Sequence, residues 1–67
     1  MKIKSNLNIQ FIDHRNVEPH KEVVICRLPD NTTTPFVTYR YDPATCEVWR
    51  GNYFSELKNA VEDFETR

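Results

Sequence analysis

Apolar and polar residues alternate in a way that predicts strands over the first two thirds of the chain. In Ile3–Phe11 the odd positions are mostly apolar and the even positions polar, the period of two typical of a half-buried strand. Glu22–Leu28 and Phe36–Tyr41 are rich in β-branched and aromatic residues and predict two further strands. The polar segment Asp13–Lys21 contains a proline and follows neither periodicity, so we expect a connecting loop there.

A turn follows the third predicted strand. In Asp42–Thr45 a proline stands second, where a type I turn favours it, and the aspartate before it can accept a backbone hydrogen bond. We therefore expect Cys46–Arg50 to return as a fourth, antiparallel strand. Gly51 is the only glycine, and its conformational freedom predicts that the chain turns out of the sheet there.

The last segment has the periodicity of a helix. Apolar side chains recur there at intervals of three and four residues, at Phe54, Leu57, Ala60, Val61 and Phe64. This pattern predicts an amphipathic helix of about three turns, with Ser55 as its N-cap. The sequence therefore predicts a single small α+β domain over residues 1–67: a mostly antiparallel sheet of three to four strands, with one C-terminal amphipathic helix packed on one face.

Composition places the protein in the ordinary globular class, with 39% hydrophobic and 28% charged residues in a chain of 67. A net charge of −1 argues against a general, charge-driven affinity for nucleic acid. The longest apolar run, Val23–Cys26, is too short to span a bilayer, and Met1–Asn6 has no apolar segment resembling a signal peptide. We therefore expect a cytoplasmic protein without a membrane partner, in which Cys26 and Cys46 are free thiols.

The register of the sheet decides which side chains remain for function. A symmetric hairpin would place Tyr41 opposite Cys46, and we expect the helix to cover the face that carries Val37, Tyr39, Tyr41, Cys46 and Val48. With Leu28 opposite Phe36, Val23 and Ile25 join that face. The other face would then carry the apolar side chains of Val24, Cys26, Leu28, Phe36 and Trp49, among the polar side chains of Thr38, Arg40 and Glu47. The sheet is thus apolar on both faces, whereas the sequence supplies one helix.

Exposed apolar patches on the order of several hundred Å² are typical of interaction surfaces. We therefore expect a partner-binding site around Trp49 as the anchor, formed by Val24, Leu28, Phe36, Thr38, Arg40 and Trp49. In the alternative interpretation, the first strand extends the core, and the Asp13–Lys21 loop or the chain ends cover Trp49. The exposed apolar side chains would then be scattered, as on any small domain.

Catalytic or metal chemistry is not indicated. His14, His20, Cys26 and Cys46 are the only soft metal ligands, and they lack the closely spaced pairs of zinc sites. Neither serine is expected beside a histidine, and Cys46 has no adjacent cationic residue to activate its thiol. We therefore expect no metal, no cofactor and no enzymatic activity.

These observations favour a non-catalytic protein-binding module that acts by occupying a surface of its partner, either another protein or a second copy. Its size is typical of small regulators and inhibitors, such as those that phages and mobile elements encode. The alternative is a nucleic-acid-binding domain, by analogy of architecture alone with AP2-type and integrase arm-binding domains. That function would use Thr38, Arg40 and Trp49, with Arg27 and Arg50 at the edges, although Glu47 on the same face counts against it.

Overall fold

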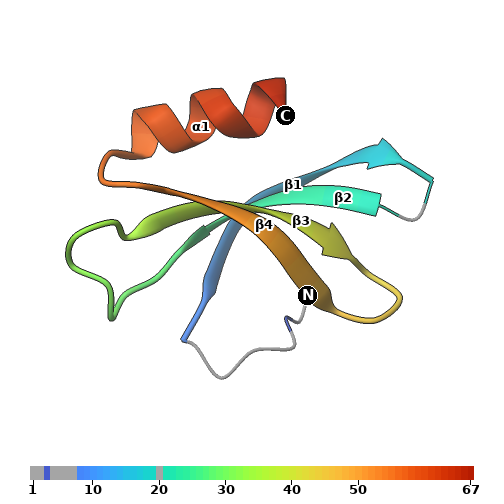
Figure 1. Ribbon diagram of the computed structural model, residues 1–67, viewed down its shortest axis with the longest axis horizontal. Helices are drawn as coiled ribbons and strands as arrows, with labels where there is room; N and C mark the ends of the chain where they lie inside the picture. The colour runs from blue at the N-terminus through green and yellow to red at the C-terminus, as the bar shows by residue number, and fades with distance from the viewer. Residues whose placement is uncertain (1–2, 4–7, 20) are drawn as a thin grey trace.

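Four strands and one helix follow one another in the computed structural model, which describes residues 3, 8–19 and 21–67. They are β1 (Gln10–Glu18), β2 (Lys21–Arg27), β3 (Phe36–Asp42), β4 (Glu47–Phe54) and α1 (Leu57–Thr66). The strands form one sheet in the order β1-β2-β3-β4, in which all neighbours are antiparallel. Helix α1 lies along one side of this sheet (Figure 1). The predicted α+β fold with a C-terminal helix is confirmed.

Both faces of the central strands are buried. On the side of α1, Val23 and Ile25 pack with Ala60 and Phe64 of the helix. The opposite face carries a second cluster of buried side chains, made of Val24, Cys26, Leu28, Val37, Tyr39 and Tyr41. A strand buried on both faces has no polar side to expose, so it is apolar without alternation. This explains the continuous run Val23–Cys26 in β2.

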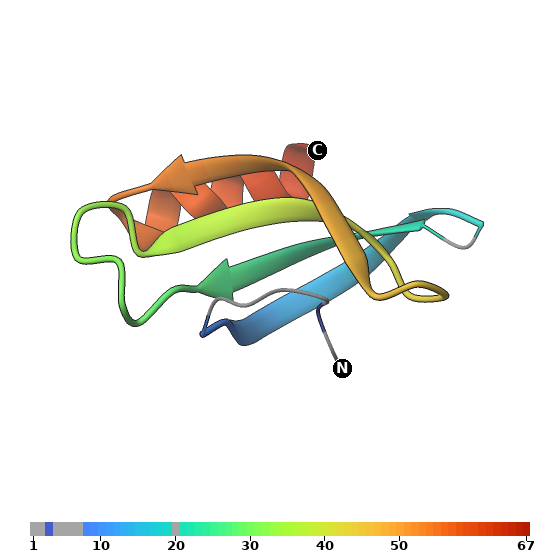
Figure 2. The same ribbon diagram turned by 60° about the horizontal axis from the view of Figure 1, so that its bottom comes forward.

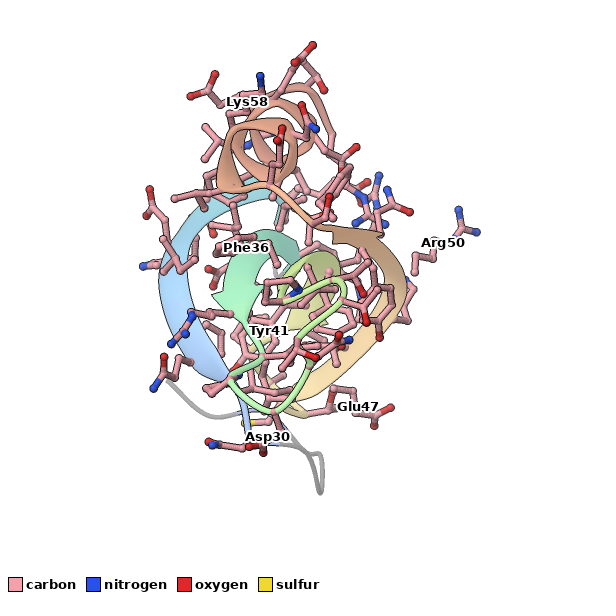
Figure 3. All side chains as sticks on the ribbon, turned by 90° about the vertical axis from the view of Figure 1, so that its left-hand side faces the viewer. Asp30, Phe36, Tyr41, Glu47, Arg50 and Lys58 are labelled. Carbon is pink, nitrogen blue, oxygen red and sulfur yellow. The ribbon has the colours of Figure 1, made fainter. Side chains whose placement is uncertain are left out.

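The second face is closed without a second helix. The sheet curves strongly, so that β1 and β4 lie on opposite sides of the side chains between them (Figure 3), and the twist of the strands is also visible from below (Figure 2). The rings of Phe11 and Tyr41 meet edge to face across this curve, with centroids 6.1 Å apart. Ile3 and Ile9 pack against the same cluster. Curvature and these two isoleucines thus account for a sheet that is apolar on both faces and has one helix.

The predicted register between β2 and β3 is wrong by one residue. Phe36 pairs with Arg27 rather than with Leu28. Because side chains alternate between faces, a shift of one residue moves every side chain of the strand to the other face. Val23 and Ile25 lie under α1 as predicted, but the side chain of β3 that joins them there is Phe36. The face predicted to lie under the helix, with Val37, Tyr39, Tyr41, Cys46 and Val48, is instead the face turned away from it.

The hairpin between β3 and β4 keeps the predicted faces but not the predicted pairs. Asp42 Oδ1 accepts the Ala44 N–H at 2.9 Å, as the sequence predicts. This bond and the nearby Lys21 ammonium lower the pKa of the Asp42 carboxyl. Cys46 has a positive φ of 61° and belongs to the turn rather than to the strand. The first pair of the hairpin is therefore Asp42–Glu47 instead of the predicted Tyr41–Cys46, and Tyr41 lies opposite Val48. The displacement of two residues preserves the alternation, so Val48 stays on the face of Tyr41.

Strand β4 continues through Gly51 to Phe54, so the predicted turn at Gly51 is wrong. The pairing shifts by one residue here, so that Arg50 and Gly51 together lie opposite Tyr39, which is the pattern of a β-bulge. Arg50 has a positive φ of 55°. A Cβ on Gly51 would lie 2.7 Å from Tyr39 Cε1 and 3.2 Å from Tyr53 Cε1. Glycine is needed at this position for the close approach of two tyrosine rings, not for a turn.

We expect Gly51→Ala to lower the free energy of unfolding by about 1–3 kcal/mol, the usual cost of an extra methyl group in a filled space. Urea unfolding monitored by fluorescence measures this change. Thr45→Ala, at an exposed turn position, is the control and should change stability by less than about 0.5 kcal/mol. A Gly51→Ala protein as stable as the control would contradict the close packing of Tyr39.

The first strand lies later in the chain than predicted. Residues 4–7 of the predicted strand Ile3–Phe11 lie outside the described residues, and β1 begins only at Gln10. It then runs through most of the predicted loop Asp13–Lys21, to Glu18. Two irregularities, at Phe11/Asp13 and Asn16/Glu18, break its register with β2. Each bulge interrupts the alternation of faces, so the period of two is lost from the sequence of this strand.

Helix α1 begins later than predicted. Glu56 occupies the N-cap in extended conformation and its side chain makes no capping hydrogen bond, so the predicted N-cap at Ser55 is wrong. Phe54 is the last residue of β4, from which it packs on the helix-side cluster. No helix in the described part of the chain is long and apolar enough to cross a membrane.

Candidate binding site at Trp49

The six side chains predicted to form one exposed patch do not lie together. Val24 and Leu28 belong to the buried cluster on the face away from α1, with 0% and 5% of their surface exposed. Phe36 and Thr38 lie on the opposite face, where Phe36 packs with the helix and Thr38 is fully buried. The prediction of a single exposed patch is wrong because it depended on the β2–β3 register. Arg40 and Trp49 remain partly exposed and adjacent, and their role in binding stays a prediction.

Arg40 and Trp49 lie directly opposite each other on β3 and β4. At the same end of the sheet, β1 ends at Glu18, which pairs with Lys21 at the start of β2. Together with Arg50 these side chains line a hollow of about 320 Å³. We call it the Trp49 hollow and define it by Glu18, Lys21, Arg40, Trp49 and Arg50. Its volume is at the lower end of the range in which proteins bind small ligands or single side chains.

Lys21 lies over the ring of Trp49. Its Nζ is 5.1 Å from the centroid of the indole, within the range in which an ammonium is attracted to the face of an aromatic ring. The same Nζ is 3.4 Å from Asp42 Oδ2. Lys21 is therefore held by two neighbours, while its side chain remains partly open to solvent. The ammonium group of Lys21 thus covers one face of the indole ring.

Arg40 is weakly paired with Glu18. Arg40 Nη1 lies 3.7 Å from Glu18 Oε1, and 62% of the Glu18 side chain is exposed. Ion pairs of this kind contribute only about 0–1 kcal/mol, because water screens the charges and the side chains lose freedom. Glu18 can therefore leave Arg40 at little cost.

Two further arginines extend the positive charge on this side of the sheet. Arg67 donates to the backbone and hydroxyl oxygens of Thr38, at 2.8 and 3.0 Å, and to the backbone oxygen of Arg50. Burial lowers the pKa of Arg67, and the positive charges of Arg40 and Arg50 lower it further, against the opposing effect of Asp63. The Arg50 side chain itself extends away from the body of the protein (Figure 3). The guanidinium groups are thus close enough to repel one another.

Charge is unevenly distributed over the molecule. The Trp49 hollow has three cationic side chains and one carboxylate in its lining, whereas the whole chain carries a net charge of −1. Many of the acidic residues lie in α1 or just before it, namely Glu56, Glu62, Asp63 and Glu65. An anionic group is therefore favoured at the hollow and disfavoured at the helix.

Sequence reasoning missed Glu18 and Lys21 as parts of the site because it assigned both to a loop. A signal was present: two residues of opposite charge flank a Pro19-His20 dipeptide. Two residues are the usual length of a tight hairpin connection, and opposite charges favour cross-strand pairing. Reading this segment as a hairpin would have brought both side chains to the end of the sheet.

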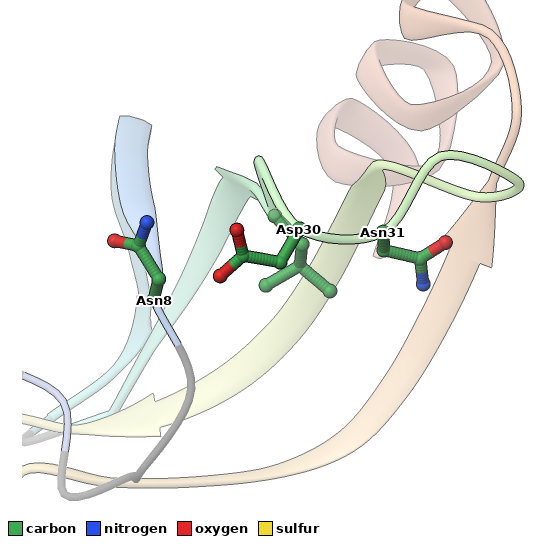
Figure 4. Close-up of a pocket in the computed structure, with 4 residues that line it drawn as sticks. Asn8, Asp30 and Asn31 are labelled. Atoms are coloured by element: carbon green, nitrogen blue, oxygen red, sulfur yellow. The ribbon is translucent and has the colours of Figure 1, made fainter.

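A second hollow, of about 170 Å³, lies near the loop after β2 and is lined by Asn8, Leu28, Asp30 and Asn31. Asp30 points toward the side of Asn8, whereas the amide of Asn31 points away (Figure 4). Asn31 is used within the loop, where its Oδ1 accepts the N–H groups of Thr33 and Thr34. This hollow is about half as large as the Trp49 hollow and has no cationic or aromatic side chain among the described residues of its lining, so the Trp49 hollow is the stronger candidate.

The surroundings of His14 and Cys26 indicate structural roles for both side chains. His14 Nδ1 lies 2.7 Å from Glu22 Oε1 on the surface of β1 and β2. Burial raises the pKa of the Cys26 thiol to about 12, so the thiolate needed for nucleophilic chemistry does not form at neutral pH. Among residues 3, 8–19 and 21–67, no three metal-ligating side chains lie close enough to hold an ion.

Comparison of the chain with protein-family models, with curated proteins and with solved structures gave no match. The description of the protein therefore rests on its own fold and candidate site. It is a small α+β domain with an open antiparallel sheet, one C-terminal helix, and a cationic hollow around its single tryptophan.

Proposed function

We propose that the protein is a non-catalytic binding module that occupies a surface of another protein through the Trp49 hollow. The observation that carries this proposal is the arrangement of a partly exposed indole beside Lys21, Arg40 and Arg50 in one concave site. Tryptophan and arginine are the residues most enriched among those that dominate binding energy in protein interfaces. Occupying a partner surface in this way is how a small regulator or inhibitor acts, and we place it in the cytoplasm.

A protein partner is favoured over nucleic acid by two observations. The analogy with sheet-based DNA binding requires an exposed sheet face away from the helix, but side chains on that face are buried beneath Ile3, Ile9 and the curved sheet. Stacking of bases requires a free aromatic face, and Lys21 already lies over one face of Trp49.

Truncation of the anchor tests the proposal. Wild-type protein and Trp49→Ala are immobilised, exposed to an extract of the cells that produce the protein, and the retained partner is purified for affinity measurement. We expect Trp49→Ala to raise the Kd about thirtyfold or more, corresponding to about 2 kcal/mol for a hot-spot residue. A partner that binds wild type and Trp49→Ala equally well would contradict the proposal.

Two controls make the result specific. Tyr53→Ala truncates another aromatic of β4 that is 48% exposed but lies outside the hollow, and it should leave the Kd unchanged. Light scattering over a range of concentrations separates a foreign partner from a second copy. A constant monomer mass supports the former, and a mass that doubles in wild type but not in Trp49→Ala identifies self-association as the function of the hollow.

A further inference from the structure

The Trp49 hollow already contains an anionic side chain of its own. Glu18 Oε1 lies 3.7 Å from Arg40 Nη1, at the edge of the hollow. A separation of 3.7 Å is longer than a charge-assisted hydrogen bond, which spans about 2.7–2.9 Å. The carboxylate is therefore near the guanidinium without forming its strongest contact, and most of its surface is in water.

The cations around Glu18 exceed what it can neutralise. Lys21 is paired with Asp42 at 3.4 Å, and Arg67 donates to backbone oxygens. The Arg50 side chain, in contrast, extends away from the protein (Figure 3). Glu18 is thus the only carboxylate among the described residues that line the hollow, and it is held weakly by Arg40. A guanidinium presents paired N–H donors in a plane, the geometry that binds a carboxylate through two parallel hydrogen bonds.

We propose that the Trp49 hollow binds a carboxylate side chain from an acidic segment of a partner protein, which replaces Glu18 at Arg40. This proposal rests on the function proposed above and names the chemistry that the hollow recognises. The incoming carboxylate pairs with Arg40, while a neighbouring carboxylate of the segment approaches Arg50 at the rim. Glu18 serves as an internal competitor that keeps Arg40 solvated and oriented until the partner arrives.

The hollow is suited to a short acidic segment rather than to a long polyanion. Three cationic side chains line it, and the helix beyond is acidic, with Glu62 and Glu65 exposed. A nucleic acid strand gains affinity by neutralising many phosphates along its length, whereas the cations at this site are the three of the hollow and the neighbouring Arg67. A segment with one or two carboxylates matches the number of cations available after Lys21 and Asp42 have paired.

The test uses the full chain and a defined probe, a blocked tetraglutamate peptide, at about 0.15 M ionic strength. Trp49 is the only tryptophan, so its fluorescence and its single indole N–H resonance report on the hollow directly. We expect Glu18→Gln to tighten binding up to about fivefold, the most that an exposed ion pair contributes. Arg40→Gln should weaken it about tenfold or more, as expected for loss of a charged hydrogen-bonding partner.

Matched variants control for net charge. Glu56→Gln removes a carboxylate from an ion pair of similar geometry, 3.8 Å from Lys58 and with 60% of the side chain exposed, outside the hollow. Arg27→Gln removes an exposed arginine at the far end of β2. Both should leave the affinity for tetraglutamate within about twofold, since distant surface charges are largely screened. Blocked tetraglutamine should not shift the indole resonance.

Several results would overturn the proposal: no response of Trp49 to tetraglutamate, the same affinity in Glu18→Gln as in Glu56→Gln, or tighter binding of an octamer of deoxythymidine than of the peptide. The last result would assign the hollow to nucleic acid. The two proposals can fail separately. If a protein partner depends on Trp49 but not on Glu18 or Arg40, the module binds protein by another chemistry. If the peptide binds as expected but no partner depends on Trp49, the acidic-group site stands and the proposed function falls.

Discussion

Replacement of Phe64 by alanine is expected to lower the free energy of unfolding by about 3–5 kcal/mol, the usual cost of truncating a buried phenylalanine. Phe64 is the large side chain through which α1 packs on Val23 and Ile25. The Arg15 guanidinium lies 5.7 Å from its ring centroid, and Arg15 Nε donates to the Phe64 backbone oxygen at 2.7 Å. A chain of 67 residues has a total stability of roughly 3–10 kcal/mol, so Phe64→Ala should be largely unfolded on mild heating.

Far-ultraviolet circular dichroism and urea unfolding measure this effect together. An isolated helix of ten residues is too short to persist in water, so the helical signal should disappear with the tertiary contacts. The control is Leu57→Ala, on the same helix but 42% exposed, which should cost less than about 1 kcal/mol. Equal effects of the two substitutions would mean that α1 packs through a different face.

Leu28→Ala is expected to lower the free energy of unfolding by about 2–5 kcal/mol, because it leaves a cavity in the cluster on the face away from α1. This substitution distinguishes the two registers of the sheet. In the predicted register Leu28 lies on an exposed face, where truncation changes stability by less than about 0.5 kcal/mol. In the structure it is buried beside Val37 and Tyr39.

Ile12→Ala serves as the matched control for Leu28→Ala, since Ile12 is an aliphatic side chain of β1 that is 46% exposed. Urea midpoints measured at one protein concentration compare the two variants with wild type. A small change for Leu28→Ala and a larger one for Ile12→Ala would place Leu28 outside the core and favour the predicted register.

The class of fold could be predicted because it depends on features that act locally. The apolar run in β2, the acceptor role of Asp42 in the turn, and the helical spacing of Ala60 and Phe64 each follow from a few neighbouring residues. The β2–β3 register could not be predicted in the same way. The connection between Leu28 and Phe36 is long and irregular, so its length sets no pairing, and both faces of β2 are apolar, so the hydrophobic pattern does not choose between them.

The candidate site was predicted only in part for the same reason. Arg40 and Trp49 were placed together correctly because both lie near a tight turn, where an error of two residues preserves the face. Val24 and Leu28 were misplaced by the register. Glu18 and Lys21 were missed because two bulges in β1 hide its alternation. Irregular edge strands are weakly encoded in sequence patterns, and here the edge strand β1 supplies the carboxylate of the hollow, Glu18.

The order of the strands has a consequence for the rate of folding. Every strand of the described sheet pairs with its neighbour in sequence, so each hairpin closes a short loop and loses little chain entropy. The hydrogen bonds from Arg15 to the backbone oxygens of Phe64 and Arg67 are exceptions, since they join residues 49 and 52 positions apart. The sheet can therefore assemble by successive local steps, with the attachment of the helix to β1 as the most distant closure in the pathway.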